Sequence, residues 1–455
     1  MASHARAQFG ETVRPLRAGA LDHIPGERGW PLIGNTLEAL ADLRAYTRRM
    51  YETYGPVYRH NVFFIEQLAL IGPEANAFFF LDRERALSSE AGWMPYLESL
   101  FPRGLMLLDF EHHRADRKIM AAAFKAPAMR RYLARLDAAI PGRIRAWGER
   151  GRFRFYDAIK TLTLEMASEV FLGLAPGETT ARVNRALADM VAASVALLRR
   201  PLPGTAYARG IRGRRVVEAF LESEIPARRT RRGDDMFTLL CQAADETGNR
   251  FDDRQIVDHM AFLWMAAHDT ITSSMSTLVY ELGRHPDWQE RLHDECASLG
   301  RDHLEHDDLG RLTLVDCAFK EALRLNAPVP AIPRMAVKDV DFGGYRIPAG
   351  TTIGVSPTFV HHMPDIWPEP ARFDPLRFTE AGGVRERPKY AWVPFGGGAH
   401  MCIGLHFATM QAKAVIFHLL RDYRIRLDGP AYRTEFRIMP LTRPKDGLPL
   451  RLERR

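Results

Sequence analysis

The sequence predicts a mainly α-helical fold with small β-sheets, and three observations support this prediction. Long stretches carry apolar residues at helical spacing, and the longest of them runs from about Asp252 to Leu282. The alternating patterns typical of strands are short and lie mostly near the N-terminus. The chain has 455 residues, of which 46% are hydrophobic, so it can bury a large core.

The first predicted strands lie at Val57 to Phe64 and at Gln67 to Ile71, and Gly72-Pro73 closes the second. Another β signal runs from Phe342 to Thr352, where neighbouring glycines and alternating side chains are typical of a small hairpin. Because these patterns are short and separated, they predict minor sheets beside a helical body.

The helices follow clear start and stop signals. Asp252 is a good N-cap for the longest helix, and Gly283 and Pro286 are expected to end it. About thirty residues at 1.5 Å each give a length of roughly 45 Å, enough to cross a whole domain. A second helix is predicted from about Leu314 to Leu325, and a third begins just after Cys402.

No internal repeat, low-complexity stretch or long like-charge run divides the chain. A single domain over residues 1–455 is therefore predicted, with residues 1–20 as a flexible N-terminal segment. No apolar run is long enough to span a membrane, and Glu11 argues against a targeting peptide, although a transit peptide is the weaker alternative. We expect a cytoplasmic monomer without a transmembrane anchor.

The net charge of +7 comes from 63 basic and 56 acidic residues, and no recognisable nucleic-acid-binding motif accompanies it. A basic patch that meets an acidic protein partner explains this charge better than nucleic acid does. The basic residues Arg199, Arg200 and Arg209 are interpreted as a solvated loop, with a carboxylate or a membrane surface as the alternative contact.

Four cysteines are scattered along the chain, without a C-x-x-C pair: Cys241, Cys296, Cys317 and Cys402. Only Cys402 follows a run of glycines, Gly396 to Gly398, and precedes a stretch that favours a helix. A cysteine at a helix N-terminus is expected to favour its thiolate form, which can bind a metal. From the residues alone, an inert buried cysteine and a partial zinc site with His400 remain alternatives.

The segment from Val393 to Ala408 resembles the haem-binding loop of the cytochrome P450 family, Phe-x-x-Gly-x-Arg-x-Cys-x-Gly. Phe395, Gly398, Cys402 and Gly404 match this pattern, whereas His400 stands where most members have arginine. The resemblance implies the triangular prism of that family, with haem b between the long central helix and the helix after the cysteine loop. It also implies that the Cys402 thiolate is the axial ligand of the iron.

Further motifs of the family occur in the family's order. Glu321 and Arg324 match its Glu-x-x-Arg, and Arg377 matches the arginine that completes a buried ion network behind the haem. His113, Arg117 and Arg334 match side chains that bind the haem propionates, and His400 can still donate a hydrogen bond to one of them.

In the middle of the long helix, Ala266-Ala267-His268-Asp269-Thr270 resembles the family's Ala-Gly-x-Asp/Glu-Thr, with Ala267 in place of the usual glycine. This resemblance implies that Asp269 and Thr270 deliver the two protons that oxygen activation consumes. The pair favours a monooxygenase over related isomerases that rearrange peroxides. A haem-binding sensor or carrier of lipophilic molecules is the alternative from another class of protein.

By the same resemblance, a small apolar substrate such as a steroid, terpenoid or fatty acid contacts the following residues: Phe262, Ala266, Ala267, Val329 and Ile332. The chain carries no flavin, nicotinamide or iron-sulfur segment, so electrons for O2 activation are expected from a ferredoxin or flavodoxin with its reductase. The predicted docking patch for that partner consists of four basic residues: Arg114, Lys118, Arg130 and Arg131.

Overall fold

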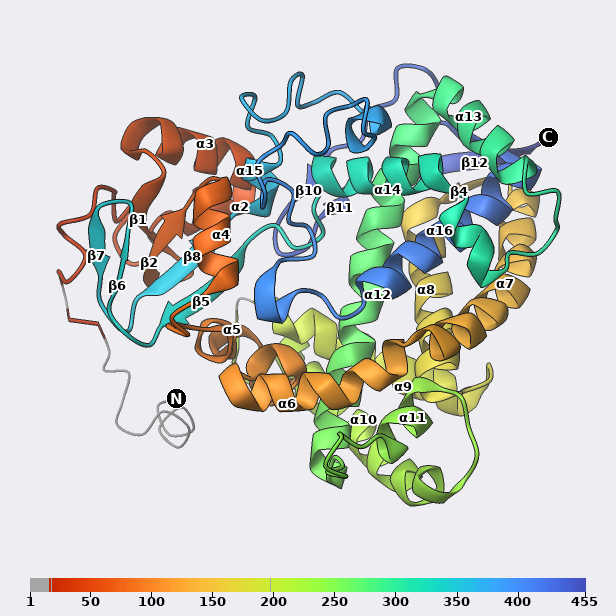
Figure 1. Cartoon of the computed structure of the whole chain (residues 1–455), viewed down its shortest axis with the longest axis horizontal. Coiled ribbons are helices and arrows are strands. Elements are labelled where there is room, and N and C mark those ends of the chain that lie inside the picture. Colours follow the sequence, from red (N-terminus) through yellow and green to blue (C-terminus); the bar gives the residue numbers. More distant parts are fainter. Residues whose placement is uncertain (1–15, 18, 197) are drawn as a thin grey trace.

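The computed structural model of the chain describes residues 16–17, 19–196 and 198–455. The predicted flexible segment at residues 1–20 therefore lies mostly outside the described residues. Helices form most of the molecule, and a mixed sheet lies at one side of them (Figure 1). This arrangement confirms the prediction of a mainly α-helical fold with small sheets.

The α-helices are α2 (Thr36–Ala41), α3 (Leu43–Tyr54), α4 (Pro73–Leu81), α5 (Ser89–Leu97), α6 (Phe110–Met120), α7 (Ala126–Glu149), α8 (Phe155–Leu172), α9 (Glu178–Ser194), α10 (Ala206–Thr230), α11 (Met236–Gln242), α12 (Asp253–Arg284), α13 (Pro286–Ala297), α14 (Thr313–Leu325), α15 (Pro357–Val360) and α16 (Leu405–Asp422). Two short 3-10 helices, η4 (Pro375–Phe378) and η5 (Gly398–His400), lie between α15 and α16.

The strands are β1 (Val57–Val62), β2 (Ile65–Leu70), β3 (Leu87–Ser88), β4 (Arg152–Arg154), β5 (Ile332–Ala336), β6 (Val340–Phe342), β7 (Tyr345–Ile347), β8 (Thr352–Val355), β9 (Tyr423–Leu427), β10 (Phe436–Arg437), β11 (Arg443–Pro444) and β12 (Pro449–Arg454). The largest sheet has the order β1-β2-β8-β5-β3, in which only β2 and β8 pair in parallel.

The predicted hairpins form with small shifts in their boundaries. β1 pairs with β2 in register Val57↔Leu70, and the turn between them at Phe63 and Phe64 has positive φ angles of 56° and 65°. β6 and β7 flank Gly343 and Gly344, whose φ angles of 60° and 83° suit a two-residue hairpin turn that glycine adopts without strain.

The long central helix α12 has 32 residues and is about 48 Å long. Asp252 accepts a hydrogen bond from the backbone of Gln255, whose side chain bonds back to the N-cap, so the predicted N-terminus carries a full capping box. At the other end the helix continues past Gly283 to Arg284, because the ring of Pro286 disfavours helical geometry only at the residue before it.

Three apolar cores of described residues hold these elements together. The largest lies among α7, α8, α12 and α16, the second lies beneath the sheet against α4, and the third lies among α2, α3, α15 and strands β1 and β2. Val393 belongs to the second core and Phe395 packs against the largest, so the loop that precedes α16 lies at their boundary. In the described part of the chain, no helix combines the length and the apolar character needed to cross a bilayer.

Candidate active site

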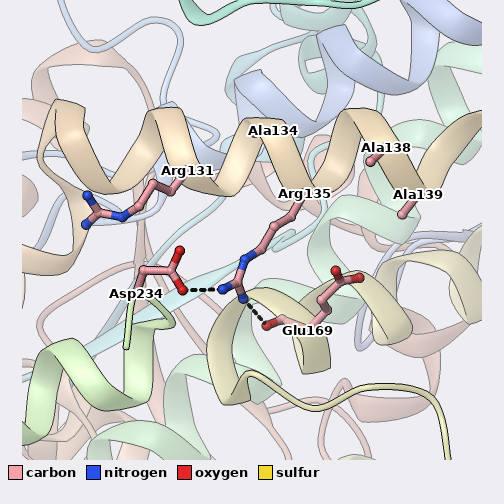
Figure 2. A pocket seen from close by; sticks show the side chains of 7 residues that line it. All are labelled: Arg131, Ala134, Arg135, Ala138, Ala139, Glu169 and Asp234. Atoms are coloured by element: carbon pink, nitrogen blue, oxygen red, sulfur yellow. Dashed lines mark hydrogen bonds and ion pairs between the residues drawn. The ribbon is translucent and has the colours of Figure 1, made fainter. Parts of the chain in front are cut away.

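A surface pocket beside α7 and α8 carries several charged side chains, and the arginine at its centre is already paired. It is lined by the following residues, shown in Figure 2: Arg131, Ala134, Arg135, Ala138, Ala139, Glu169 and Asp234. Arg135 pairs with Asp234 and also donates to the carbonyl of Glu169 at 3.1 Å. The cation at the centre of this pocket is therefore already neutralised.

The cysteine loop rests directly on α4. Gly398 has a φ angle of 62°, and a Cβ atom at this position would lie 1.9 Å from the carbonyl oxygen of Phe80. Only glycine fits this close backbone contact. The N–H of Cys402 donates to the carbonyl of Phe395 at 2.9 Å, and α16 begins with a bond from Ala408 to Gly404. These contacts fix Cys402 at the entrance of α16.

Cys402 differs from the other three cysteines, which are buried, because its side chain is exposed. The surrounding chain nevertheless crowds the thiol, and desolvation raises its pKa above the ordinary value. The N–H of Gly404 and the charge of Arg117 oppose this shift only in part. The helix end thus favours the thiolate, whereas desolvation within the polypeptide opposes it, and metal binding by Cys402 stays a prediction. A bound metal cation would supply the missing positive charge.

Four basic side chains gather beside the loop, as the sequence motifs predicted. His113 and Arg117 come from α6, Arg334 comes from β5, and His400 comes from η5. The rings of His113 and His400 stack with their centroids 3.8 Å apart. Arg117 donates to the carbonyl of Met401 at 2.6 Å. Arg334, which is buried, donates to the carbonyl of Phe79 and lies over its ring at 4.7 Å.

Burial and the neighbouring positive charges disfavour the protonated, charged forms of the side chains in this cluster. Burial and the nearby Arg117 and Arg334 lower the pKa of His113 to about 4. Burial, His113 and the two arginines lower the pKa of His400 to about 2, so neither ring is charged at neutral pH. Desolvation likewise lowers the pKa of Arg334 to about 10. An anionic ligand would relieve this repulsion.

One carboxylate lies near the cluster, but its charge is engaged elsewhere. Asp109 Oδ1 is 3.9 Å from His400 Nε2. The same carboxylate accepts hydrogen bonds from the hydroxyl of Ser88 and from the N–H of Ser89. The thiol can bind a metal ion, and the flanking basic groups can bind two carboxylates. Haem carries one iron ion and two carboxylates, so these residues fit haem. Among the described residues, His, Cys, Asp and Glu side chains form no three-membered metal cluster that would favour zinc.

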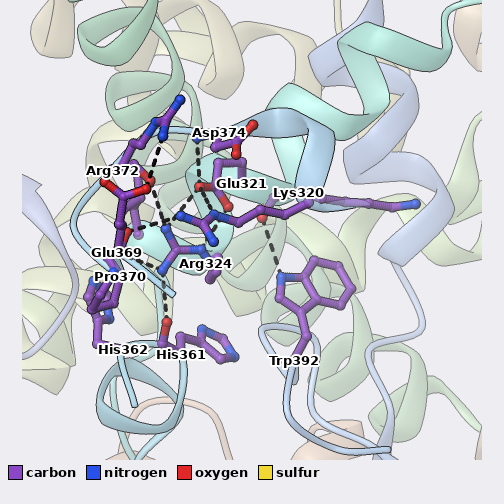
Figure 3. A network of polar contacts seen from close by, with 12 residues as sticks. Lys320, Glu321, Arg324, His361, His362, Glu369, Pro370, Arg372, Asp374 and Trp392 are labelled. Carbon is purple, nitrogen blue, oxygen red and sulfur yellow. Dashed lines mark hydrogen bonds and ion pairs between the residues drawn. The ribbon is translucent and has the colours of Figure 1, made fainter. Parts of the chain in front are cut away.

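The predicted ion network lies at the end of α14 (Figure 3). Arg324 meets Glu321 through two bonds, Nε to Oε2 at 2.7 Å and Nη2 to Oε1 at 2.9 Å, and both side chains are fully buried. Arg377 approaches Glu321 Oε1 to 3.4 Å, and the N–H of Asp374 donates to the same oxygen at 2.9 Å. The three residues named from the sequence therefore lie together.

His361 joins this network to the cysteine loop, a connection that the sequence motifs did not reveal. Its carbonyl accepts from Arg324 Nη1 at 2.9 Å, and its Nε2 accepts from the N–H of Val393 at 2.9 Å. Burial, together with the charges of Arg324 and Arg44, lowers the pKa of His361 to about 3, so the ring is neutral. The residue lies in an irregular segment without periodicity, and no local signal marks it.

The polar residues of α12 divide into two groups. Several hydroxyls donate back to carbonyls one turn earlier, as Thr270 does to Ala266 at 2.8 Å and Thr272 does to His268 at 2.9 Å. The buried hydroxyls of Ser273 and Thr277 have no partner among the described residues. Asp269 instead meets Lys160 of α8 at 3.3 Å and His268 Nδ1 at 3.1 Å. Burial opposes ionisation of Asp269, but these two neighbours outweigh it and lower its pKa to about 2.

Lys160 is the site residue that sequence reasoning missed here. It lies on a different helix, and a lysine at a helix surface carries no motif that would predict its partner. Its side chain is partly exposed, so it connects the nearly buried Asp269 carboxylate to the molecular surface.

The predicted substrate residues lie on α12, just after α14 and on β5. Phe262, Ala266 and Ala267 lie on α12, Val329 follows α14, and Ile332 begins β5. The segment from α5 to residue 107 contacts both α12 and β5. A Cβ on Gly92 would lie 2.6 Å from Arg334 Cα, and one on Gly104 would lie 2.4 Å from the ring of Phe262. Their common place in one substrate pocket stays a prediction from the family resemblance.

Comparison with known proteins agrees with this fold. The family model described as Cytochrome P450 matches residues 24–446. The chain is 38% identical over 451 residues to the Putative cytochrome P450 136 of Mycobacterium tuberculosis, covering 97% of this chain and 91% of the relative. It is 27% identical over 419 residues to the Taxane 10-beta-hydroxylase of Taxus cuspidata, covering 88% and 83% of the two chains.

A solved structure described as "Retinoic acid bound cyanobacterial CYP120A1" matches with a TM-score of 0.86 and 29% identity, over 95% of this chain and 99% of that one. The family match spans most of the chain, and the helical body, the sheet and the element order agree with this solved structure. The chain therefore belongs to the cytochrome P450 family and is a haem-dependent monooxygenase.

Proposed function

We propose that Cys402 is the axial ligand of the haem iron and that the enzyme hydroxylates an apolar, isoprenoid-like small molecule. The observation that carries the first part is the exposed Cys402 thiol beside the four basic side chains of His113, Arg117, Arg334 and His400. Phe395, Gly398 and Gly404 shape the loop that holds the thiol. When bound, haem supplies the redox chemistry that inserts one atom of O2 into the substrate.

The basic cluster binds and orients the cofactor. Arg334 and Arg117 provide charged donors to its two carboxylates, and His113 and His400 provide neutral ring donors. Because Arg334 is held against Phe79 and Arg117 against Met401, both donors are preorganised. The Glu321, Arg324 and Arg377 network has a structural role, since it holds the chain that leads into the cysteine loop through His361 and Val393.

In this proposal Asp269 and Thr270 deliver the protons. With a pKa of about 2, Asp269 is a carboxylate at neutral pH, so it accepts a proton before it can pass one on. Lys160 is partly exposed and holds the carboxylate at the surface side, where Asp269 takes up a proton from solvent. Thr270 relays it through its hydroxyl, which first releases the carbonyl of Ala266.

The substrate class rests on the lining and on the relatives. Phe262, Ala266, Ala267, Val329 and Ile332 are apolar, and they favour a ligand that is mostly hydrocarbon. Taxanes are the substrates named for one relative, and retinoic acid is bound in the solved structure. Both are isoprenoids, which narrows the steroid, terpenoid and fatty-acid candidates to the terpenoid-like ones.

Electrons come from a separate protein, a ferredoxin or flavodoxin with its reductase. The predicted docking residues lie on α6 and α7, and α6 also carries Arg117, which bonds to the cysteine loop. Two of the four are partly neutralised, because Lys118 pairs with Glu246 at 2.8 Å and Arg130 with Asp307 at 3.3 Å. Arg114 and Arg131 are thus the stronger contacts for an acidic partner.

The deciding experiment is the difference spectrum of the reduced protein with carbon monoxide. The wild type is expected to give the red-shifted band of thiolate-ligated iron, and Cys402→Ser is expected to lose it while haem is still bound through the basic cluster. Cys317→Ser is the matched control, since Cys317 is a cysteine away from the loop. A red-shifted band that persists in Cys402→Ser refutes the assignment. A high-spin shift with terpenoids but not with fatty acids supports the substrate class, and the reverse contradicts it.

A further inference from the structure

The hydroxyl side chains of α12 differ in how they are satisfied. Four of them donate to the backbone carbonyl four residues earlier, as hydroxyls inside a helix commonly do: Thr270, Thr272, Ser274 and Ser276. Ser273 and Thr277 are 2% and 0% exposed, yet neither hydroxyl has a partner in the part of the chain that the structure describes. Because a buried polar group without a partner costs free energy, these two hydroxyls call for an explanation.

The two unpartnered hydroxyls lie on the face of α12 that carries Thr270. Ser273 follows Thr270 by three residues, and Thr277 follows Ser273 by four, so the three side chains share one face of the helix. One further step of four residues leads to Glu281. We call these four residues the polar stripe, and it covers about 16 Å of the helix.

Glu281 ends the polar stripe as a carboxyl inside the protein. Its side chain is only 8% exposed. The charges of Glu321 and Arg324 act on it, so it lies near the ion network of Figure 3. Burial raises the pKa of Glu281 to about 7 against the charge of Arg284, and Glu321 adds to the rise. At neutral pH such a carboxyl holds a proton in part of the molecules and can release it.

The C-terminal end of α12 connects Glu281 to solvent. Nδ1 of His285 donates to the carbonyl of Glu281 at 2.8 Å, so this nitrogen carries a proton. The same nitrogen lies 3.7 Å from the carboxyl oxygen Oε2, and the His285 side chain is 29% exposed. The ring can therefore take up a proton on its solvent side and pass one to the carboxyl on the other.

The gaps along the polar stripe suit single water molecules. Side chains three or four residues apart on a helix have their Cβ atoms about 5–6 Å apart, and two successive O–H···O hydrogen bonds span about 5.5 Å. Buried water typically bonds to polar groups that otherwise lack partners. The hydroxyls of Ser273 and Thr277 can each accept a hydrogen bond on one side and donate one on the other, as proton transfer requires.

We propose that Ser273, Thr277 and Glu281 form a second proton route, which reaches Thr270 from the C-terminal half of α12. This inference rests on the proposed function, in which Thr270 is the relay, and it adds a source for one of the two protons. Glu281 gives its proton to the hydroxyls and regains one from solvent through His285, so the carboxyl returns to its starting state.

The second route approaches Thr270 from a different side than Asp269 does. Asp269 is adjacent to Thr270 in sequence and so points about 100° around the helix from the polar stripe, toward Lys160. A contact that only held α12 against its neighbours would pair the hydroxyls of Ser273 and Thr277 with those neighbours, whereas none of the described residues pairs with them.

The test compares variants in the Asp269→Asn background, where the first route is blocked. The haem-loaded full chain is supplied with its electron donors and with a terpenoid that gives the high-spin shift. In this background E281Q and T277V are each expected to lower product formation at least about tenfold further. In the wild-type background they are expected to cost about twofold or less, because parallel routes replace each other. S276A is the matched control, since Ser276 is buried on another face of α12.

The infrared spectrum of the resting haem-loaded protein gives a readout besides turnover. The wild type is expected to show a carboxylic acid band that disappears as the pH rises through about 7, and E281Q is expected to lack this band. T277V is expected to shift the band, because it removes the nearest hydroxyl of the polar stripe. S276A is expected to leave the band unchanged.

Equal product formation by D269N and D269N/E281Q, or a Glu281 band that T277V does not move, overturns the second route alone. Wild-type coupling of product to NADH in T270V overturns the proposed function, and the second route with it. The spectrum of the reduced carbon monoxide complex checks that each variant is folded. If T277V does not fold, S273A in the same background takes its place in the turnover test, with the same expected loss.

Discussion

Single side chains set the proton chemistry of this enzyme. Asp269 is held as a carboxylate by Lys160 and His268, although it is largely buried. The lysine of this ion pair is partly exposed, so its ammonium group can exchange the carboxylate for water during turnover. This arrangement suits a group that must exchange protons repeatedly.

Replacement of Lys160 by methionine is expected to uncouple turnover. Without the lysine, protons reach Asp269 more slowly, and we expect product formation to fall on the order of tenfold while hydrogen peroxide release increases. Lys160→Arg keeps the charge and is expected to restore part of the coupling. The ratio of product to NADH consumed measures the effect, with Lys320→Met as a control at another helix-surface ion pair. Wild-type coupling in Lys160→Met would contradict the role.

His361 is expected to make the protein sensitive to mild acid. Its pKa falls from 6.5 in the unfolded chain to about 3 in the folded protein, so the folded state favours the neutral ring. The unfolded state therefore binds the proton first, and stability is lost as the pH falls below 6.5. Between pH 7.5 and 5.5 this group alone costs about 1.4 kcal/mol.

Urea unfolding at the two pH values checks this expectation. His361→Asn keeps an acceptor for the N–H of Val393 but has no proton to bind, so its loss of stability over this range is expected to be smaller by that amount. Equal losses in the two proteins would show that His361 does not titrate on unfolding.

At the scale of elements, the loop before α16 depends on a backbone contact rather than on side chains. Gly398→Ala places a methyl group against the carbonyl of Phe80 and also strains a positive φ angle, so the loop must move off α4. We expect the variant to incorporate haem poorly, measured as the ratio of haem absorbance to protein. Gly151→Ala has a similar φ angle of 68° with open space around it, and it is expected to cost only about 1 kcal/mol in urea unfolding and no haem.

The elements themselves were largely predictable, because their signals are local. The capping box at Asp252 fixed the start of α12, and the glycine pair at 343 and 344 fixed the turn between β6 and β7. The pairing of β2 with β8 and the contact of Lys160 with Asp269 were not predictable, since residues far apart in sequence meet only through tertiary packing. The desolvation of the Cys402 thiol was not predictable for a related reason, because it depends on the whole surrounding fold.

For the whole molecule, electron delivery is expected to depend on long-range charge. The double variant Arg114→Glu and Arg131→Glu reverses the two docking residues that no carboxylate neutralises, and we expect reduction by an acidic ferredoxin to slow about tenfold at low salt. The difference is expected to shrink at high salt, where the Debye length shortens. Stopped-flow reduction rates measure this effect, and Arg145→Glu with Arg150→Glu is the matched control. Equal rates at all salt concentrations would exclude the patch.

The network in Figure 3 also has a consequence for the order of folding. Glu321 and Arg324 bond to each other within α14, but their remaining contacts reach His361, Pro370, Arg372 and Asp374 much later in the chain. His361 then holds Val393, where the cysteine loop begins. Because contacts between distant residues form slowly, the loop reaches its final geometry only after this long segment has closed. We therefore expect each newly made chain to capture its cofactor late in folding.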